Sequence, residues 1–256
     1  MYLPLSRPEM PASFAPHFHS RCWRAGRHGA LAPQEVAEPD LTPLYRLRWQ
    51  VYCEECGFVP AADHPQGLER DSHDAQAAHF GARNLRGELV GLSRLVFCSE
   101  QGVYPFELAG LVPHAGVQLL RDGQAAEVSR LMVRRDYRRR RGDGLSGVGD
   151  ESLPPQPRSE RRQGSAQIVL SLYRQMFQYS RRAGIDTWYA AMERFLPLSL
   201  QRLGLAFERI GDEGQYHGPV APYRQDLRLL EATLRERHPA LLHWLQAPDE
   251  PAQGLS

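Results

Sequence analysis

The strongest hydrophobic pattern in the chain lies between residues 166 and 183, where apolar side chains recur every three or four positions. This spacing places them on one face of an α-helix. The positions on that face are Ile168, Val169, Leu172, Tyr173, Met176 and Phe177. Gly184 follows directly and suits the left-handed conformation that often ends a helix. The pattern therefore predicts a buried helix over 166–183.

Weaker helical patterns predict three further helices, over 40–56, 194–204 and 225–245. Asp40 or Thr42 can cap the first of these, and Pro43 lies in its first turn. Pro239 interrupts the pattern of the last helix. We therefore expect that helix to be broken at the proline.

Runs rich in aliphatic, aromatic and β-branched residues predict strands over 78–85, 88–97, 124–133, 185–192 and 205–211. Arg86 and Gly87 suit a hairpin turn between the first two strands. Strands and helices alternate after this hairpin, and the sequence contains no internal repeat. The fold class predicted is α/β (α+β), with a central mixed sheet flanked by helices.

Two segments lack such patterns. Residues 1–40 are rich in proline and predict a poorly ordered N-terminal arm. Residues 145–164 are poor in apolar side chains and rich in serine, proline and glycine, so they predict a mobile insertion. We therefore expect one folded domain over 41–225 that carries this insertion, followed by a C-terminal helix and tail over 226–256.

Composition narrows the class of protein. The chain has 256 residues, of which 42% are hydrophobic and 24% charged, with a formal net charge of +1. These values exclude a collagen, a coiled coil and a largely disordered chain. No apolar stretch is long enough to span a membrane and none resembles a signal peptide, so we expect a cytoplasmic protein. Every basic residue other than histidine is arginine, which excludes a lysine Schiff base.

The cysteines favour packing over metal or redox chemistry. Cys53 and Cys56 form a single C-x-x-C pair, whereas a structural zinc site usually needs two such pairs. The segment around them has a helical pattern, in which residues three apart share a face. A metal or redox role is the minor alternative. Cys98 lies among apolar strand residues, so we expect an inert thiol there.

Three carboxylates lie close together at Glu69, Asp71 and Asp74. Such a group repels itself unless cations compensate it. Arg48 lies in the first predicted helix and Arg94 in an apolar strand pattern, and both need carboxylate partners if they are buried. Mutual pairing satisfies both requirements. The alternative is a solvated acidic turn.

The predicted strand over 124–133 carries a second charged group, Glu127 and Arg130. Residues three apart in a regular strand face opposite sides of the sheet. If both serve one site, the strand must bulge between them, and a bulge releases backbone N–H groups from the ladder. Such groups can stabilise the oxyanion that develops in acyl transfer. We therefore expect an interrupted ladder between Glu127 and Val133.

Arginine occupies six of the eight positions from Arg134 to Arg141. From Arg139 through Gly142 to Gly144 the sequence reads R-x-x-G-x-G, a pattern that can hold a pyrophosphate through backbone N–H groups. The insertion separates these glycines from the next helix, which weakens that interpretation. The alternatives are a solvated loop, contact with nucleic acid, or docking of an acidic carrier protein.

The order of these residues resembles the acyl-homoserine-lactone autoinducer synthases. It is still more similar to the N-acyl amino acid synthases and to the acyltransferases associated with PEP-CTERM/exosortase systems. The resemblance covers about residues 45–225 and rests on Arg48, Tyr52, Gly57, Phe58, Glu69, Asp71, Asp74, Arg94, Phe106, Glu127, Ser129 and Arg130, with distal stretches at Tyr216-His217-Gly218 and Pro222-Tyr223. The autoinducer synthases typically carry tryptophan where this chain has Phe58, which counts against the branch that uses S-adenosylmethionine.

The resemblance implies a GNAT-type fold and transfer of an acyl chain, expected to be long, from an acyl-carrier-protein or CoA thioester to the amine of an amino acid or similar small acceptor. Glu127 would be the general base beside a charged cluster formed by Arg48, Glu69, Asp71, Asp74, Arg94 and Arg130. The thioester carrier would bind at Arg134, Arg135, Arg139, Gly142 and Gly144. The substrates would contact Phe58, Phe106, Ser129 and Met132.

It further implies no metal and no tightly bound cofactor, with acyl-ACP or acyl-CoA as co-substrate and an acidic acyl carrier protein as partner. No contact with nucleic acid is expected. Three other functions remain open. They are an acyl-homoserine-lactone synthase, an acetyl-CoA-dependent GNAT N-acetyltransferase, and a non-enzymatic RNA-binding or adaptor protein that would use the arginine run. The last leaves the carboxylates unexplained.

Overall fold

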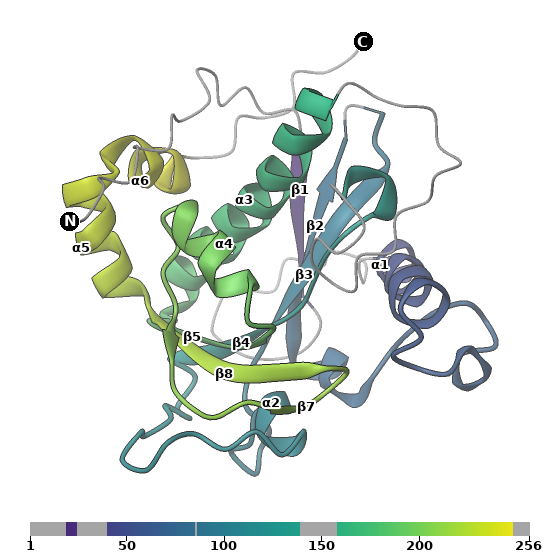
Figure 1. The fold of residues 1–256 in the computed structure, drawn as a ribbon, viewed down its shortest axis with the longest axis horizontal. Coiled ribbons are helices and arrows are strands. Elements are labelled where there is room, and N and C mark those ends of the chain that lie inside the picture. Colours follow the sequence, from purple (N-terminus) through teal and green to yellow (C-terminus); the bar gives the residue numbers. More distant parts are fainter. Residues whose placement is uncertain (1–18, 25–39, 85, 139–157, 248–256) are drawn as a thin grey trace, which may run out of the picture.

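A computed structural model of the protein describes residues 19–24, 40–84, 86–138 and 158–247. Its strands form one sheet in the order β1-β2-β3-β4-β5-β8-β6, with β7 paired to β8 (Figure 1). The strands are β1 (His19–Arg24), β2 (Ala77–Arg83), β3 (Leu89–Val96), β4 (Ala125–Val133), β5 (Thr187–Met192), β6 (Glu208–Arg209), β7 (Gly214–Gln215) and β8 (Pro219–Asp226). Only β4 and β5 pair in parallel; the other neighbours are antiparallel.

Helices cover both sides of this sheet. The α-helices are α1 (Thr42–Trp49), α2 (Pro105–Leu108), α3 (Arg158–Ala183), α4 (Leu196–Arg202), α5 (Leu227–Arg237) and α6 (Pro239–Gln246). Shorter turns are the π-helix η1 (Gln50–Glu55) and the 3-10 helices η2 (Ala61–Asp63), η3 (Ser72–Gln76) and η4 (Arg135–Tyr137). Figure 1 shows α1 on the opposite side of β2 and β3 from α3. This confirms the predicted mixed sheet flanked by helices.

The hydrophobic core divides into three clusters that follow the two sides of the sheet. The largest lies between the sheet and α3, and includes Val128 and Phe177. On the other side, Met132 packs against Leu44 of α1. The third cluster, around Tyr189, surrounds α2. α1 and α2 therefore cover different parts of this second side of the sheet.

Several predicted elements have different ends in the structure. The helix expected over 166–183 begins at Arg158, so α3 includes the last residues of the predicted insertion. The composition of 145–164 misled the prediction, because its final residues include helix formers such as arginine, glutamate and glutamine. Residues 145–157 lie outside the described residues. The break at Pro239 is confirmed, since α5 ends at Arg237 and α6 begins at the proline.

The first predicted helix also changes character along its length. It is α-helical only to Trp49 and continues as the π-helix η1. Its N-cap is Leu41 rather than Asp40 or Thr42, although the Asp40 carboxylate accepts a hydrogen bond from the backbone N–H of Thr42 at 3.0 Å. π-helical turns inside helices occur frequently at functional sites.

Three strands were not predicted: β1, β8 and the two-residue β7 that pairs with β8. β1 lies within the arm expected to be poorly ordered and pairs with β2 at the edge of the sheet; most of the remaining arm lies outside the described residues. β8 contains Pro219 and Pro222, which argue against a strand. The Pro222 carbonyl accepts from the N–H of Ile210 at 2.9 Å. In an antiparallel strand the carbonyl and the nitrogen of one residue point to the same side, so the Pro222 nitrogen faces the gap between β6 and β7. There the missing N–H interrupts no ladder.

No helix within the part of the chain that the structure describes is long and apolar enough to cross a membrane.

Candidate active site

Strand β4 contains the bulge that the sequence analysis predicted. In the register of β3 and β4, Leu92 pairs with Met132 and Arg94 pairs with Ser129. The two residues of β3 are two positions apart, whereas their partners in β4 are three positions apart. Arg130 lies within that extra step, and its φ of 54° is in the left-handed region that non-glycine residues rarely adopt. The ladder between β3 and β4 is therefore interrupted at Arg130.

The bulge places Glu127 and Arg130 on the same side of the sheet. Val128 and Leu131 both pack into the core cluster under α3, although residues three apart in a regular strand face opposite sides. Met132 then packs on the other side, with α1. The extra residue thus turns Arg130 away from α3 and toward the side on which Glu127 lies.

Strands β4 and β5 part at the same place. They pair in parallel over three residues each, from Ala125 to Glu127 and from Thr187 to Tyr189. β4 then continues to Val133 and β5 to Met192 without pairing to each other. A splay between two parallel strands leaves backbone groups available to a ligand, and here it begins directly after Glu127.

Arg48 lies between carboxylates under helix α1. Its Nε donates to Glu69, its Nη1 donates to Asp74 at 2.6 Å, and its Nη2 lies 3.6 Å from an oxygen of Asp71. Arg48 and Glu69 are almost completely buried. A buried guanidinium of this kind needs carboxylate partners to offset its lost hydration.

Arg94 and Arg130 complete this charged cluster. The two Nη atoms of Arg94 donate to the two oxygens of Asp71, each at 2.6 Å, and its Nη1 also donates to Asp74. The Nη2 of Arg130 donates to Glu69 at 3.0 Å and to Asp71 at 2.9 Å. Three guanidinium groups therefore face three carboxylates, and their formal charges cancel.

The pKa values of the carboxylates show how strongly the arginines hold them. Burial alone would raise the pKa of Glu69, but Arg130 and Arg48 lower it to about 2. Burial opposes ionisation of Asp71 too, yet the hydrogen bonds from Arg94 and the nearby arginine charges keep its pKa well below the usual range. Both groups are ionised at neutral pH, so the cluster is a fixed support for Arg130.

The spacing of the acidic residues has a local structural reason. Asp71 is the N-cap of η3 and accepts from the N–H of His73 at 3.0 Å, while the Asp74 carboxylate accepts from the N–H of Asp71 at 2.9 Å. This reciprocal arrangement is a capping box, in which the N-cap side chain and the side chain three positions later each accept from a backbone N–H. The same spacing that caps η3 aims both carboxylates at the arginines.

Glu127 lies outside this network. One carboxylate oxygen accepts from the backbone N–H of Phe106 at 2.9 Å, and the residue is only 3% exposed. Burial raises the pKa of Glu127 to about 8, against the lowering effects of the Phe106 N–H and of Arg94 and Arg130. A buried carboxyl whose pKa lies near neutrality is suited to accept and release a proton.

The loop that contains α2 holds Glu127 in place. The Tyr104 hydroxyl donates to the carbonyl of Leu120 at 2.6 Å, and the N–H of Leu120 donates to the hydroxyl of Tyr189 at 2.9 Å. Tyr189 is the residue paired with Glu127 across β4 and β5. The loop is thereby fastened to the strand beside Glu127, which fixes the position of the Phe106 N–H.

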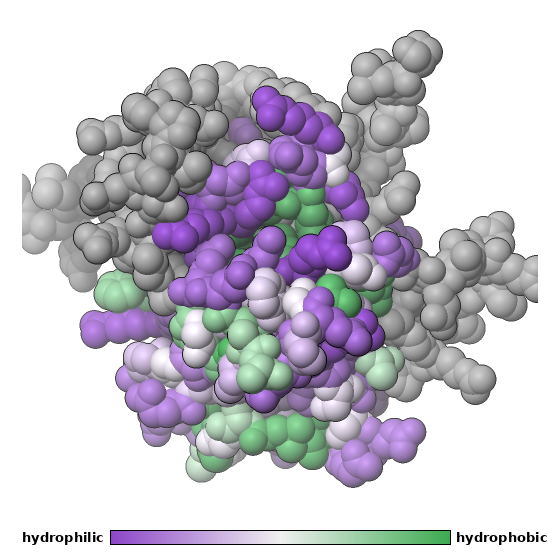
Figure 2. Space-filling model, turned by 90° about the vertical axis from the view of Figure 1, so that its right-hand side faces the viewer, coloured by the Kyte–Doolittle hydropathy of each residue, from purple (hydrophilic) through white to green (hydrophobic). Residues whose placement is uncertain are grey.

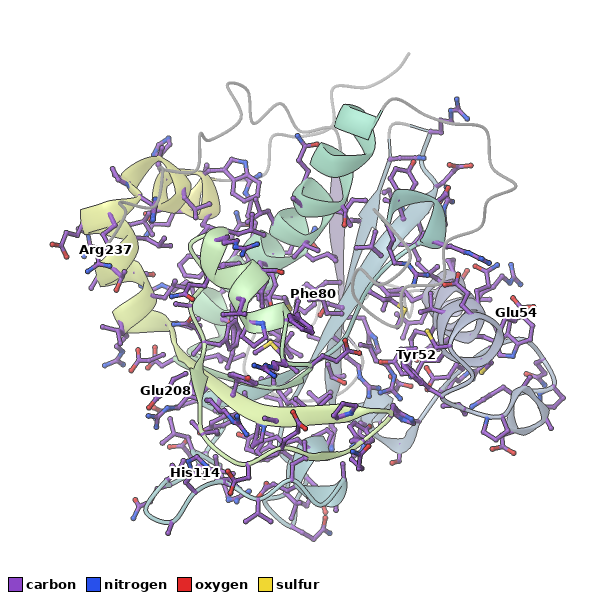
Figure 3. The ribbon with its side chains drawn as sticks, viewed as in Figure 1. Tyr52, Glu54, Phe80, His114, Glu208 and Arg237 are labelled. Carbon is purple, nitrogen blue, oxygen red and sulfur yellow. The ribbon has the colours of Figure 1, made fainter. Side chains whose placement is uncertain are left out.

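An aromatic group borders the charged cluster. The Arg130 guanidinium lies 4.6 Å from the centre of the Tyr52 ring, in cation–π geometry. Phe58 contacts Tyr52 edge to face at 5.5 Å, and His217 stacks on Phe58 at 5.3 Å. Figure 3 shows Tyr52 between α1 and the tip of the β7–β8 hairpin. Sequence analysis placed His217 in the resemblance but gave it no role.

The residues predicted to contact substrates differ in how deeply they are buried. Phe58 is half-buried at the aromatic group, whereas Phe106 and Met132 are fully buried in the core. Phe106 offers its backbone N–H to Glu127 rather than an exposed ring. The carbonyl of Ser129 accepts from the hydroxyl of Ser93 at 3.3 Å.

Two arginines of the run from Arg134 to Arg141 form ion pairs with carboxylates. Arg134 donates twice to Asp136, at 2.7 Å each, and lies 3.4 Å from Glu88. Arg138 forms an ion pair with Glu55. Nearby carboxylates therefore neutralise these two arginines of the run. Arg135 is half-buried in η4; Arg139, Gly142 and Gly144 lie outside the described residues.

Cys53 and Cys98 are thiols outside any disulfide, and within the described residues no cluster of three or more potential ligands could hold a metal ion. The described surface on the side that carries α1 is mainly hydrophilic, with smaller hydrophobic areas between (Figure 2).

Comparison with known proteins agrees with this geometry. The family described as "Acetyltransferase (GNAT) domain" matches residues 47–146, which contain all the charged residues of the site. The acyl-homoserine-lactone synthase of Aeromonas salmonicida is 25% identical over 198 residues, covering 74% of this chain and 82% of that protein. Its counterpart from Aeromonas hydrophila is 24% identical over the same length and coverage.

Solved structures show the same fold. TofI in a ternary complex with an inhibitor and MTA has a TM-score of 0.56 and 19% identity, covering 87% of this chain and 98% of that one. The acyl-homoserine-lactone synthase LasI has a TM-score of 0.55 and 18% identity, with coverage of 82% and 90%. Residues 47–146 therefore match a GNAT acetyltransferase domain, the chain is similar to the acyl-homoserine-lactone synthases over most of its length, and the protein is an acyltransferase enzyme.

Proposed function

We propose that the protein transfers an acyl chain from an acyl-carrier-protein or CoA thioester to the amine of an amino acid or similar small acceptor. The observation that carries this proposal is the position of Glu127. It is a buried carboxyl with a pKa raised to about 8, at the point where β4 and β5 part and beside the bulge of β4. The catalytic domain would span residues 41–225.

Glu127 supplies the base that acyl transfer to an amine requires. An acceptor amine enters as an ammonium ion and must lose a proton before its nitrogen can attack the thioester carbonyl. Glu127 takes this proton, directly or through a water molecule, and its raised pKa reduces the mismatch with the ammonium group. The new C–N bond forms as the C–S bond breaks, and the thiol of the carrier leaves with a proton.

The bulge of β4 supplies the second requirement, stabilisation of the oxyanion. Where the ladder is interrupted at Arg130, backbone N–H groups are released from strand pairing and can donate to the thioester oxygen as it becomes negative. The splay beyond Glu127 gives the thioester access to those groups. The scheme needs neither a covalent acyl-enzyme nor a metal ion or tightly bound cofactor.

The acyl donor and its partner are less closely defined. An acidic acyl carrier protein would dock beside the arginine run, and Arg135 is the described residue of that run for which no ion pair is present in the structure. The CoA-dependent acyl-homoserine-lactone synthase BjaI, bound to SAM and isopentyl-CoA, has a TM-score of 0.51 to this chain, so both donors belong in the test. An association with PEP-CTERM/exosortase systems and a cytoplasmic location are part of the proposal.

A second candidate function is synthesis of acyl-homoserine lactones. The curated relatives favour it because both are acyl-homoserine-lactone synthases. Phe58, where tryptophan is typical of those enzymes, favours the amino acid acceptor instead. The two functions differ in the acceptor, which is S-adenosylmethionine in one and a free amino acid in the other.

The test is thiol release from acyl-CoA and acyl-ACP substrates of several chain lengths, with amino acids or S-adenosylmethionine as acceptor. Products are identified by mass spectrometry. We expect N-acyl amino acids, and we expect Glu127→Gln to abolish their formation while the protein stays folded. Acyl-homoserine lactone as the main product would establish the second candidate. No thiol release with any acceptor would contradict both.

A further inference from the structure

The turn between β7 and β8 has an unusual conformation. The N–H of Tyr216 donates to the carbonyl of Gly218 at 2.9 Å, which closes a tight turn around His217. His217 has a φ of 53°, and Arg130 is the other non-glycine residue with positive φ in the described chain. Left-handed backbone at a bulky residue is strained and persists where surrounding contacts impose it, commonly at functional sites.

The contacts that impose it join two distant parts of the fold. His217 stacks on Phe58 with rings 27° apart, and meets Tyr52 edge to face at 6.1 Å. Tyr52 and Phe58 belong to the segment after α1, which packs over β3 and β4, whereas His217 extends from β8, which pairs with β5. The contact therefore joins the segment after α1 to the β7–β8 turn, on either side of the splay between β4 and β5.

The contact lies on the side of the sheet that carries Glu127 and Arg130. Tyr52 holds the Arg130 guanidinium against one face of its ring, and the bulge turns Arg130 and Glu127 to this side. An amine that gives its proton to Glu127 must approach from here.

The aromatic residues differ in how much surface they leave open. Tyr52 is buried, whereas Phe58, Tyr216 and His217 are only half-buried. The half-buried rings form one group. The ring centres of Tyr216 and His217 lie 4.6 Å apart, and His217 also stacks on Phe58. A molecule near Glu127 would thus meet aromatic surface on this side.

We propose that Phe58 and His217 form the wall of the acceptor side of the site, and that His217 is a specificity-determining residue that favours amines with an apolar or aromatic substituent. This inference rests on the proposed function. Aromatic surface gains contact with apolar groups. A charged substituent finds no free partner there, because Arg130 is already neutralised by Glu69 and Asp71, and it loses hydration.

The experiment compares His217→Asn with wild type, because asparagine tolerates left-handed backbone and removes the ring without adding strain. Phe58→Leu is a second variant that keeps apolar volume. His114→Asn is the matched control, since His114 is exposed on a distant loop at the bottom of Figure 3. KM and kcat are measured for leucine, phenylalanine, lysine and aspartate as acceptors, and for the acyl thioester.

We expect wild type to prefer leucine and phenylalanine. His217→Asn should raise KM for these two acceptors about five- to tenfold, the fold-change expected for loss of one aromatic contact. KM for the thioester should stay constant, and the control should behave as wild type. A loss of thermal stability alone cannot produce this pattern.

Three results would overturn the inference. Unchanged acceptor KM in both variants, or a rise only in KM for the thioester, would show that the wall does not contact the acceptor, and the proposed function would still stand. A wild-type preference for lysine or aspartate would have the same meaning. Failure of wild-type protein to transfer acyl groups to any acceptor would remove the proposed function and this inference together.

Discussion

Replacing Glu127 with glutamine tests whether the Glu127 carboxyl keeps its proton in the folded protein near neutral pH. In the unfolded chain a glutamate ionises near 4.5, whereas burial raises the pKa of folded Glu127 to about 8. Below pH 4.5 Glu127 is protonated in both the folded and the unfolded chain, and its contribution to the free energy of unfolding is fully present. As pH rises from 4.5 to 8 the unfolded state loses a proton that the folded state keeps, so this stability is lost.

The size of the effect follows from proton linkage. One proton contributes about 1.4 kcal/mol for each pH unit, so wild type should lose about 4 kcal/mol of unfolding free energy from this group between pH 5 and pH 8. Glutamine has no proton to lose and can still accept from the Phe106 N–H. The stability of Glu127→Gln relative to wild type should therefore rise by that amount over the same range.

The assay is urea unfolding of both proteins at pH 5, 6, 7 and 8, with Glu88→Gln as control. The Glu88 side chain is half exposed, and the hydrogen bond from Asn84 and the charge of Arg134 lower its pKa, so its replacement should show no trend in this range. A stability difference between Glu127→Gln and wild type that is the same at pH 5 and pH 8 would refute the reasoning, because Glu127 would then be ionised throughout.

Three further outcomes follow from the same geometry. Because the base must lose its proton, kcat/KM for acyl transfer should rise with pH and level off above about pH 8; a flat profile would remove Glu127 from the base role. Arg130→Ala removes one of the two arginines that pair with buried Glu69 and leaves the charged cluster with one excess negative charge, so it should lower stability by about 3–5 kcal/mol; an unchanged Tm would contradict a buried cluster. In Gly211→Ala the new Cβ would lie 2.5 Å from Pro222 and against the carbonyl of Val112, so we expect about 1–3 kcal/mol of destabilisation in urea unfolding; unaltered stability would mean that this loop can shift.

The residues that the sequence grouped by charge are grouped in the structure as well. Glu69, Asp71 and Asp74 could be paired with Arg48 and Arg94 from sequence because buried charges must be compensated, and their spacing is that of a capping box. The bulge could be predicted for a similar reason, since two functional side chains three apart in a strand cannot otherwise share one side.

Other features gave no sequence signal. β8 was missed because its prolines argue against a strand, and only the interrupted neighbouring strands explain why they are tolerated. The sequence of the arginine run gives no sign of ion pairing, yet Arg134 pairs with Asp136 and Arg138 pairs with Glu55, which is distant in sequence. Local composition cannot reveal such partners.

The sequence by itself determined most of the helices and strands and the need for a compensated charged cluster, because these follow from periodicity and from the cost of burying charge. Glu127 as the proton acceptor to test came from the resemblance to known acyltransferases. Tertiary structure alone decided the raised pKa of Glu127 and the meeting of His217 with Phe58. A pKa depends on how completely a carboxyl is removed from water, and a contact between residues so far apart in the chain depends on how the sheet brings them together.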